Sequence, residues 1–149
     1  MDIASIRNDI MNTALSEFER LNCETLKPFV PMMMLKGKPL NFDLHFPLLP
    51  FFKMRRPRQT VYMAGRQVGK SASLASSGIL RGRIIPDYDT LCVQPRFEQI
   101  KRFSGNYVDK MIQTSPFKDF LSSPGRSSSI MERPVGDNST LFFAHAFLS

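Results

Sequence analysis

Apolar residues recur every three or four positions along the first twenty or so residues, and this spacing predicts an amphipathic helix. The apolar positions begin at Ile3 and end at Leu21, with Asp2 as the N-cap. Arg7 and other polar residues occupy the opposite side. This helix belongs to an N-terminal segment, 1–26. Packing against its own domain is the interpretation that we favour, and docking on a partner is the alternative.

The next segment, 27–59, has a different composition, because prolines occur at positions 28, 31, 39, 47 and 50. Proline at that density excludes a long helix or a central strand. We expect an extended, partly buried segment that wraps around the domain. The triplet Met32-Met33-Met34 is interpreted as core filling, because methionine adapts to irregular gaps between side chains.

A strand, a helix and a second strand are predicted at the start of the third segment, 60–149. Thr60–Ala64 is rich in β-prone residues, Lys70–Arg83 has the pattern of a helix, and Thr90–Gln94 has the composition of a strand. A Pro-Asp pair ends the helix. The crossover of this β-α-β unit should be right-handed.

The remaining pattern predicts a helix, a loop and a β-hairpin. The helix begins near Phe97 and ends near Thr114, and a serine-rich loop follows at 122–128. The hairpin joins Ile130–Val135 to Thr140–Phe147. Its second strand is apolar on both faces and therefore needs cover on both sides. We expect an α/β fold that is incomplete in this chain.

Composition narrows the class of protein. A chain of 149 residues with 42% hydrophobic content supports one core. Two distant cysteines, Cys23 and Cys92, without any Cys/His spacing of the zinc type, fit a reducing compartment. No apolar run has the length of a membrane span, and the N-terminus lacks a signal-peptide core. We therefore expect a soluble, intracellular protein.

Positive charge is concentrated in one region. The chain has a formal net charge of +7, and 53–102 contains eleven Lys or Arg against three Asp or Glu, a local balance of +8. A polyanion such as a nucleotide or a nucleic acid suits this region, and a solvated basic face is the alternative. The basic run just before the first predicted strand consists of Lys53, Arg55, Arg56 and Arg58.

The stretch from Ala64 to Ser71 reads Ala-Gly-Arg-Gln-Val-Gly-Lys-Ser and lies between a predicted strand and a predicted helix, as a Walker A phosphate-binding loop requires. Gly69 lets the main chain approach a phosphate, Lys70 brings positive charge to the β- and γ-phosphates, and Ser71 offers a hydroxyl to Mg²⁺. Ala64 stands where the pattern has its first glycine. The alternative is a glycine-containing turn with a solvated lysine.

No acidic residue of the kind that completes a P-loop hydrolase follows the loop. Such enzymes end an apolar strand in Asp, often Asp-Glu, to hold the Mg²⁺ shell and orient the attacking water. Asp87 and Asp89 follow a helix exit. Asp137 lies in a hairpin turn, and Glu132 lies within a short strand. We therefore expect phosphate binding without rapid hydrolysis from this chain alone.

The run Met63–Ser71 resembles the Walker A region of the large terminase subunit of tailed bacteriophages, the ATPase that drives genome packaging. The Arg66-Gln67 pair inside the loop is the most specific part of this resemblance. The stretch 91–104 is similar to the family's next strand and helix, and 136–143 resembles the hairpin that precedes its Walker B strand. The resemblance covers the chain from about Phe29 to its end.

This resemblance implies a P-loop NTPase fold, a RecA- or helicase-like parallel sheet flanked by helices, of which this chain is the first part. It implies ATP and Mg²⁺ as cofactors, with Lys70 on the β/γ-phosphates, Ser71 on Mg²⁺ and Arg66 as a cis-acting arginine at the γ-phosphate. Where the family has an aromatic-Gln pair that reads adenine, the nearest equivalent is Phe46-Pro47. The implied phosphate-binding residues are Ala64, Gly65, Arg66, Gln67, Val68, Gly69, Lys70, Ser71 and Ala72.

The resemblance also implies partners: double-stranded DNA, a phage portal protein, the small terminase subunit and further copies of the chain in a ring, all in the cytoplasm of the bacterial host. The family's Walker B acids, coupling motif and nuclease domain are absent from this sequence. One alternative is a stand-alone or degenerate module that binds nucleotide or DNA without hydrolysis. Another is a different helicase-like P-loop ATPase, and the Arg66-Gln67 pair argues against it. The candidate DNA contacts are Lys53, Arg55, Arg56, Arg58 and Arg96.

Overall fold

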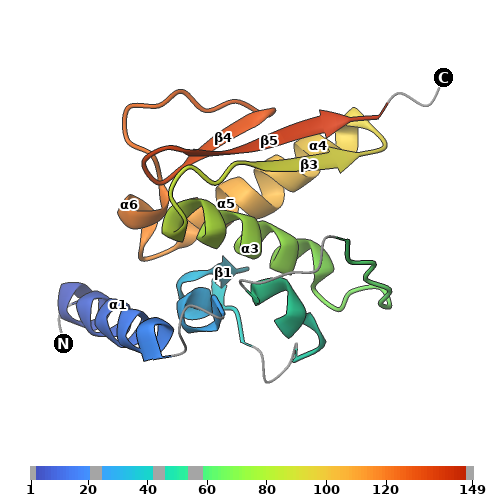
Figure 1. Ribbon diagram of the computed structural model, residues 1–149. Coiled ribbons are helices and arrows are strands. Elements are labelled where there is room, and N and C mark those ends of the chain that lie inside the picture. Colours follow the sequence, from blue (N-terminus) through green and yellow to red (C-terminus); the bar gives the residue numbers. More distant parts are fainter. Residues whose placement is uncertain (1–2, 21–24, 42–45, 54–58, 147–149) are drawn as a thin grey trace.

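The computed structural model describes residues 3–20, 25–41, 46–53 and 59–146, and they form a mixed α/β fold (Figure 1). A three-stranded sheet lies at one side of the molecule, and helical segments pack on one of its faces. Helix α3 (Lys70–Ile84) lies between this sheet and the N-terminal part of the chain, and it contacts both. The helix that follows the candidate loop is therefore the centre of the fold.

The sheet has the strand order β3-β5-β4. Strand β3 (Thr90–Gln94) pairs in parallel with β5 (Ser139–His145), which pairs antiparallel with β4 (Glu132–Val135). The predicted strand at 90–94 and the predicted hairpin are therefore confirmed. Because β5 has a partner on each side, it is the central strand, which agrees with its apolar sequence.

The predicted first strand, Thr60–Ala64, is not a strand in the structure. This segment has no regular secondary structure, and Val61 and Met63 are 87% and 91% exposed. The ring of Tyr62 packs edge-to-face on Phe51, with their centroids 4.7 Å apart. β-prone residues form a strand only when they pair with a neighbouring strand, and within the described residues this segment pairs with neither of the edge strands β3 and β4. The predicted β-α-β unit is therefore absent from the described sheet.

Helix α3 approaches the sheet closely because two of its residues lack side chains. A Cβ atom on Gly78 would lie 3.0 Å from Leu141 Cδ2, and one on Gly82 would lie 3.2 Å from Ser139 Cβ. Leu141 and Ser139 both belong to β5, so the glycines place the helix axis directly over the central strand. This agrees with the small-residue composition of the helix.

On its other side, α3 is bonded to the segment that leads to the candidate loop. Arg81 is buried, and its guanidinium donates hydrogen bonds to the carbonyl oxygens of Phe51, at 3.4 Å, and of Lys53. The Ser77 hydroxyl also donates to the Phe51 carbonyl, at 2.8 Å. Burial lowers the pKa of Arg81, and its interaction with Tyr88 partly offsets this effect.

The predicted helix from Phe97 to Thr114 is confirmed as a continuous helical segment, but its middle turn is a π-helix that the sequence did not predict. Ile100, Val108 and Met111 bury one side of this segment. The segment consists of α4 (Phe97–Phe103), the π turn η3 (Ser104–Asp109) and α5 (Lys110–Thr114), and the short helix α6 (Lys118–Leu121) follows.

The predicted N-terminal helix is confirmed as α1 (Ile3–Arg20), and it packs on its own domain. Ala14 is buried and Ile10 is partly buried against the core, where α1 contacts the 3-10 helix η1 (Lys27–Met32). The N-cap candidate Asp2 lies outside the described residues. Within the described ranges, no helix has the length and apolarity to cross a membrane.

The described parts of the proline-rich segment form no long helix, as predicted, but they are more regular than the expected extended chain. Met32 and Met33 are fully buried, which confirms their interpretation as core residues. Short 3-10 turns tolerate the prolines. The elements after η1 are β1 (Met34–Leu35) and β2 (Lys38–Pro39), which form a two-stranded hairpin, and the 3-10 helix η2 (Phe46–Phe52).

Among the described residues, helices cover one face of the sheet and not the other. Leu141 and Phe143 of β5 are buried beneath them, whereas Leu91 and Val93 of β3 are 64% and 54% exposed on the opposite face. The expected cover of β5 on both sides is therefore present on one side.

Candidate functional site

The candidate loop is a tight turn that leads directly into α3. Arg66 and Gln67 form its turn, and Gln67 and Gly69 have positive φ angles of 61° and 83°. A glycine at position 69 adopts this left-handed conformation without the steric cost of a Cβ atom. Lys70 is then the first residue of the helix. The sequence therefore places a permissive glycine where the chain reverses onto the helix axis.

Lys70 folds back over the loop from which it emerges. Its Nζ atom donates hydrogen bonds to the carbonyl oxygens of Ala64, at 2.6 Å, and of Gly65, at 2.5 Å. The lysine thus closes a ring from the first to the seventh residue of the motif and places its positive charge beside the loop. The amine is therefore bonded to carbonyl groups of the loop itself.

The first turn of α3 offers main-chain donors that lie before the hydrogen-bond ladder of the helix. The Ser73 amide is the first of the helix to bond within it, to the Gly69 carbonyl at 2.9 Å, so the amides of Lys70, Ser71 and Ala72 precede the helical ladder. No side chain in the described ranges caps this end. The amides and the helix dipole therefore favour an anion at this end.

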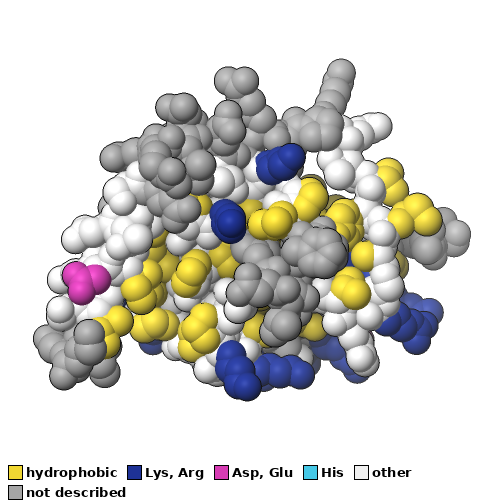
Figure 2. Space-filling model, turned by 90° about the horizontal axis from the view of Figure 1, so that it is seen from below, with side chains coloured by type: hydrophobic (Ala, Val, Ile, Leu, Met, Phe, Trp, Pro, Cys, Tyr) yellow, Lys and Arg dark blue, Asp and Glu magenta, His cyan; other side chains and the backbone are white. Residues whose placement is uncertain are grey.

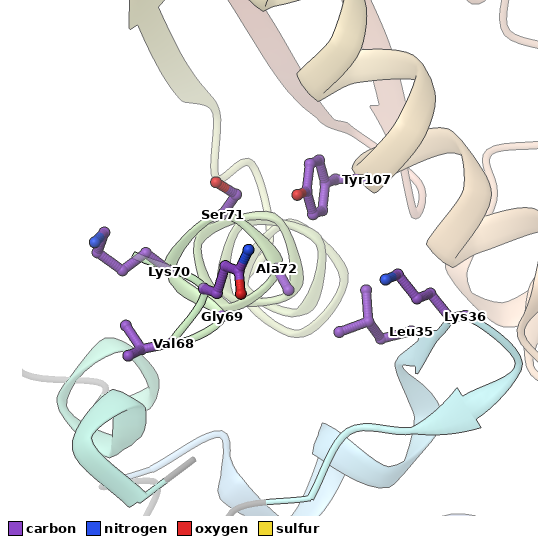
Figure 3. Close-up of a pocket in the computed structure, with 9 residues that line it drawn as sticks. Leu35, Lys36, Val68, Gly69, Lys70, Ser71, Ala72 and Tyr107 are labelled. Carbon is purple, nitrogen blue, oxygen red and sulfur yellow. The ribbon is translucent and has the colours of Figure 1, made fainter. Parts of the chain in front are cut away.

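A cavity of about 550 Å³ opens beside this turn (Figure 3). A volume of this size suits a nucleotide-sized ligand. Two lysines, Lys36 and Lys70, line it, and no acidic residue is among its described lining residues. The described lining residues are Leu35, Lys36, Gln67, Val68, Gly69, Lys70, Ser71, Ala72 and Tyr107.

The wider surface has the same sign of charge. In Figure 2, Lys and Arg side chains occur at several places across the visible face, whereas acidic side chains are seen only near the end that carries α1. This distribution agrees with the excess of basic residues in the sequence from 53 to 102. Basic side chains on this face favour the approach of an anion.

The other predicted site residues are spread over the molecule. Arg66 is exposed in the turn of the loop and is not among the residues that line the cavity. Lys53 and Arg96 are exposed at separate places, Lys53 in a bridge to Thr25 and Arg96 at the start of α4. Three basic candidates, Arg55, Arg56 and Arg58, lie outside the described residues, and so do the side chains of Phe46 and Pro47.

The acidic residues considered from the sequence have structural partners or lie elsewhere. Asp89 accepts a hydrogen bond from the Thr140 amide at 2.8 Å, and Asp137 pairs with Arg83 at 3.2 Å. Asp87 and Glu132 have no place in the cavity wall, and the same is true of Asp89 and Asp137. Within the described ranges, no cluster of three or more His, Cys, Asp or Glu side chains could hold a metal ion.

The donor set of the cavity fits a polyphosphate better than a metal ion alone. Two amines and the first amides of α3 are suited to phosphate oxygens, and the exposed Ser71 hydroxyl is the lining group that the motif assigns to Mg²⁺. Mg²⁺ keeps several waters and is commonly held by few protein groups together with substrate phosphates. The residues therefore fit Mg²⁺ that arrives with a nucleotide.

Three cavity residues were missed by the sequence analysis. Leu35 and Lys36 come from the β1–β2 hairpin within the proline-rich segment, and Tyr107 comes from the π turn. The Lys-Gly pair at 36–37 predicts a turn but does not reveal that the turn faces the loop.

Comparison with known protein families gives no match for this chain, and comparisons with curated proteins and with solved structures give none either.

Proposed function

We propose that the loop 64–72 binds the phosphates of Mg·ATP, and that the chain is the N-terminal part of the ATPase domain of a phage terminase large subunit with a P-loop NTPase fold. One observation carries the proposal: Lys70, the lysine of the motif, leaves the first turn of α3 and lies across the loop, bonded to the carbonyls of Ala64 and Gly65. The cavity beside it supports the same function.

In this proposal, the chain's own groups bind and orient the triphosphate. The amides of Lys70, Ser71 and Ala72 donate to phosphate oxygens at the positive end of α3. The Lys70 amine exchanges its two carbonyl acceptors for the β- and γ-phosphates, and the Ser71 hydroxyl holds Mg²⁺. The metal, when bound, neutralises charge on the β- and γ-phosphate oxygens.

Rapid hydrolysis requires an acid that the described residues do not bring to the cavity. The proposed motor therefore obtains it elsewhere, and this chain binds ATP with slow turnover. Within the whole motor, a ring of subunits on the portal protein would use hydrolysis to move double-stranded DNA into a procapsid, with the small terminase subunit as a further partner. Arg66 would act on the γ-phosphate from within the loop.

The test is a calorimetric titration of the chain with ATP, with and without Mg²⁺. Saturable binding that strengthens with Mg²⁺ and is competed by ADP is the expected result. Absence of binding at millimolar ATP contradicts the proposal. Turnover is measured on the same samples by phosphate release, with an expected rate far below that of the complete motor.

A second candidate function, binding to a nucleic-acid backbone without hydrolysis, is favoured by the basic region and by the exposure of Lys53 and Arg96. Its test is the salt dependence of the affinity for a double-stranded DNA of random sequence. Each phosphate contact contributes about −0.9 to the slope of log K against log salt. If Arg96 binds a phosphate, Arg96→Ala should reduce the magnitude of that slope by about one. Lys118→Ala is the control, because Lys118 is an exposed lysine outside the basic region, and it should leave the slope unchanged.

A further inference from the structure

We infer that Lys36 and Tyr107, which lie outside the Walker A motif, complete the nucleotide site: Lys36 binds the phosphate chain and Tyr107 binds the nucleoside. This inference rests on the proposed function of the loop. The two residues are assigned from their places in the cavity, where they lie on the side opposite Val68 and Lys70 (Figure 3).

Lys36 is presented by a fixed turn. It has a φ angle of 52° and Gly37 has one of 77°, so the two residues form the tight turn of the β1–β2 hairpin. A lysine at positive φ is uncommon and costs free energy relative to glycine or asparagine. The hairpin is anchored behind the turn, where the Leu40 amide donates to the Met33 carbonyl at 2.8 Å. The fold thus holds a lysine where a turn alone would favour another residue.

The Lys36 amine faces the first turn of α3 without a counter-charge among the described residues. Figure 3 shows it pointing toward the helix axis, on the side opposite Lys70. No ion pair within the described ranges involves Lys36, and no acidic residue is among the described residues that line the cavity. Two amines that flank one set of helix amides suit a ligand with several negative charges in a row, such as a triphosphate.

Tyr107 reaches the cavity because of the π turn. π turns occur often at functional sites, where the extra residue redirects the side chains of the helix. The Tyr107 ring is partly buried against Phe103, with centroids 5.9 Å apart. Its hydroxyl points toward the first turn of α3 in Figure 3, and it has no hydrogen-bond partner within the described ranges. A half-buried aromatic ring with a free hydroxyl suits a base or ribose, because it offers both a stacking face and a polar group.

The experiment uses two probes, ATP and inorganic tripolyphosphate, which has the phosphate chain but no nucleoside. Lys36→Met should weaken the binding of both probes about tenfold, which corresponds to about 1.4 kcal/mol. Lys36→Arg, which keeps the positive charge, should bind both nearly as tightly as the unmodified chain. Lys38→Met is the matched control, since Lys38 is exposed on β2 and is not a cavity residue, and it should change either affinity less than about twofold.

Tyr107→Leu should weaken ATP binding about tenfold and leave tripolyphosphate binding unchanged. Equal loss for both probes overturns the assignment of Tyr107 to the nucleoside, and unchanged ATP binding overturns any role for it. Circular dichroism of each variant establishes that it is folded. A measurement without substitution completes the test: tripolyphosphate should protect the Lys36 amine from acetylation in the unmodified chain, and equal labelling with and without it overturns the assignment of Lys36.

The inference and the proposed function fail in different ways. If ATP and tripolyphosphate do not bind the unmodified chain at all, the proposed function of the loop is wrong, and the inference falls with it. If they bind and Lys70→Ala abolishes binding, but Lys36→Met behaves like Lys38→Met, the loop assignment stands and the inference about Lys36 is overturned.

Discussion

The Nζ atom of Lys70 lies 2.6 Å from the carbonyl oxygen of Ala64, so the first and the seventh residues of the motif are bonded to each other. This bond uses only the main chain of Ala64. The alanine side chain is exposed, and the residue has no positive φ angle that would require glycine. The replacement of the motif's first glycine by alanine is therefore compatible with the geometry of the loop.

Lys70→Ala should weaken ATP binding by about a hundredfold or more, because it removes the charge-assisted bonds to the phosphates and the bond that shapes the empty loop. Titration calorimetry measures the effect, and the thermal midpoint of unfolding should change little because Lys70 is partly exposed. Lys101→Ala, a change of an exposed lysine on α4, is the control. ATP binding that survives in Lys70→Ala would rule out the loop as the site.

Arg66→Ala should lower turnover in the complete protein far more than it lowers nucleotide affinity. The motivation is its position in the turn of the loop, exposed and outside the cavity wall, from which it would reach a γ-phosphate only when ATP is bound. An interaction made chiefly in the transition state affects kcat rather than binding. Steady-state kinetics and nucleotide titration of the same variant separate the two effects. A pure affinity defect would argue against a transition-state role.

Much of the fold could be predicted because local patterns carry it. Thr90–Gln94 is a strand with the predicted ends, α1 begins at Ile3, the first apolar position of its pattern, and α3 begins at Lys70 as predicted. The hairpin that contains β4 and β5 also follows from a turn between two apolar runs. In each of these cases, the secondary structure that the local pattern favours is also the one that the neighbouring elements stabilise by packing or pairing.

The failures arise where a partner decides the structure. Thr60–Ala64 has the propensity of a strand, but within the described residues it pairs with no strand of the sheet. Lys36 and Tyr107 were missed because they reach the cavity from elements far from the loop in sequence. The π turn that exposes Tyr107 adds a single residue to a helical pattern, which does not alter the apolar spacing enough to be detected.

Cys92 should react slowly with thiol reagents at pH 8 in a Cys23→Ser background. Burial raises the pKa of the Cys92 thiol above its ordinary value, and the hydrogen bond from Gln94 opposes that effect only in part. The reactive thiolate is therefore scarcer than in a free cysteine. The rate of reaction with a chromogenic disulfide measures this. A rate equal to that of free cysteine would contradict the assigned environment.

The same shift predicts a pH dependence of stability. An unfolded cysteine ionises with a pKa of about 8.5, so above that pH the unfolded state loses its proton first and the free energy of unfolding decreases. Below that pH the contribution of Cys92 is constant. Urea titrations between pH 7 and pH 10 should therefore show a smaller decrease for Cys92→Ser than for the unmodified chain. Parallel pH profiles of the two proteins would contradict the prediction.

Arg81→Met should destabilise the fold by about 2–4 kcal/mol. The guanidinium is buried and donates to the carbonyls of Phe51 and Lys53. Its removal takes away the donor to Lys53 and one of the donors to Phe51, and methionine can replace neither. Those bonds attach the chain that enters the candidate loop to α3, and urea denaturation measures their loss. Asp137→Asn is the control, because its ion pair with Arg83 is largely exposed and should contribute less than about 1 kcal/mol. If the two variants lose the same stability, Arg81 does not hold the entry to the loop.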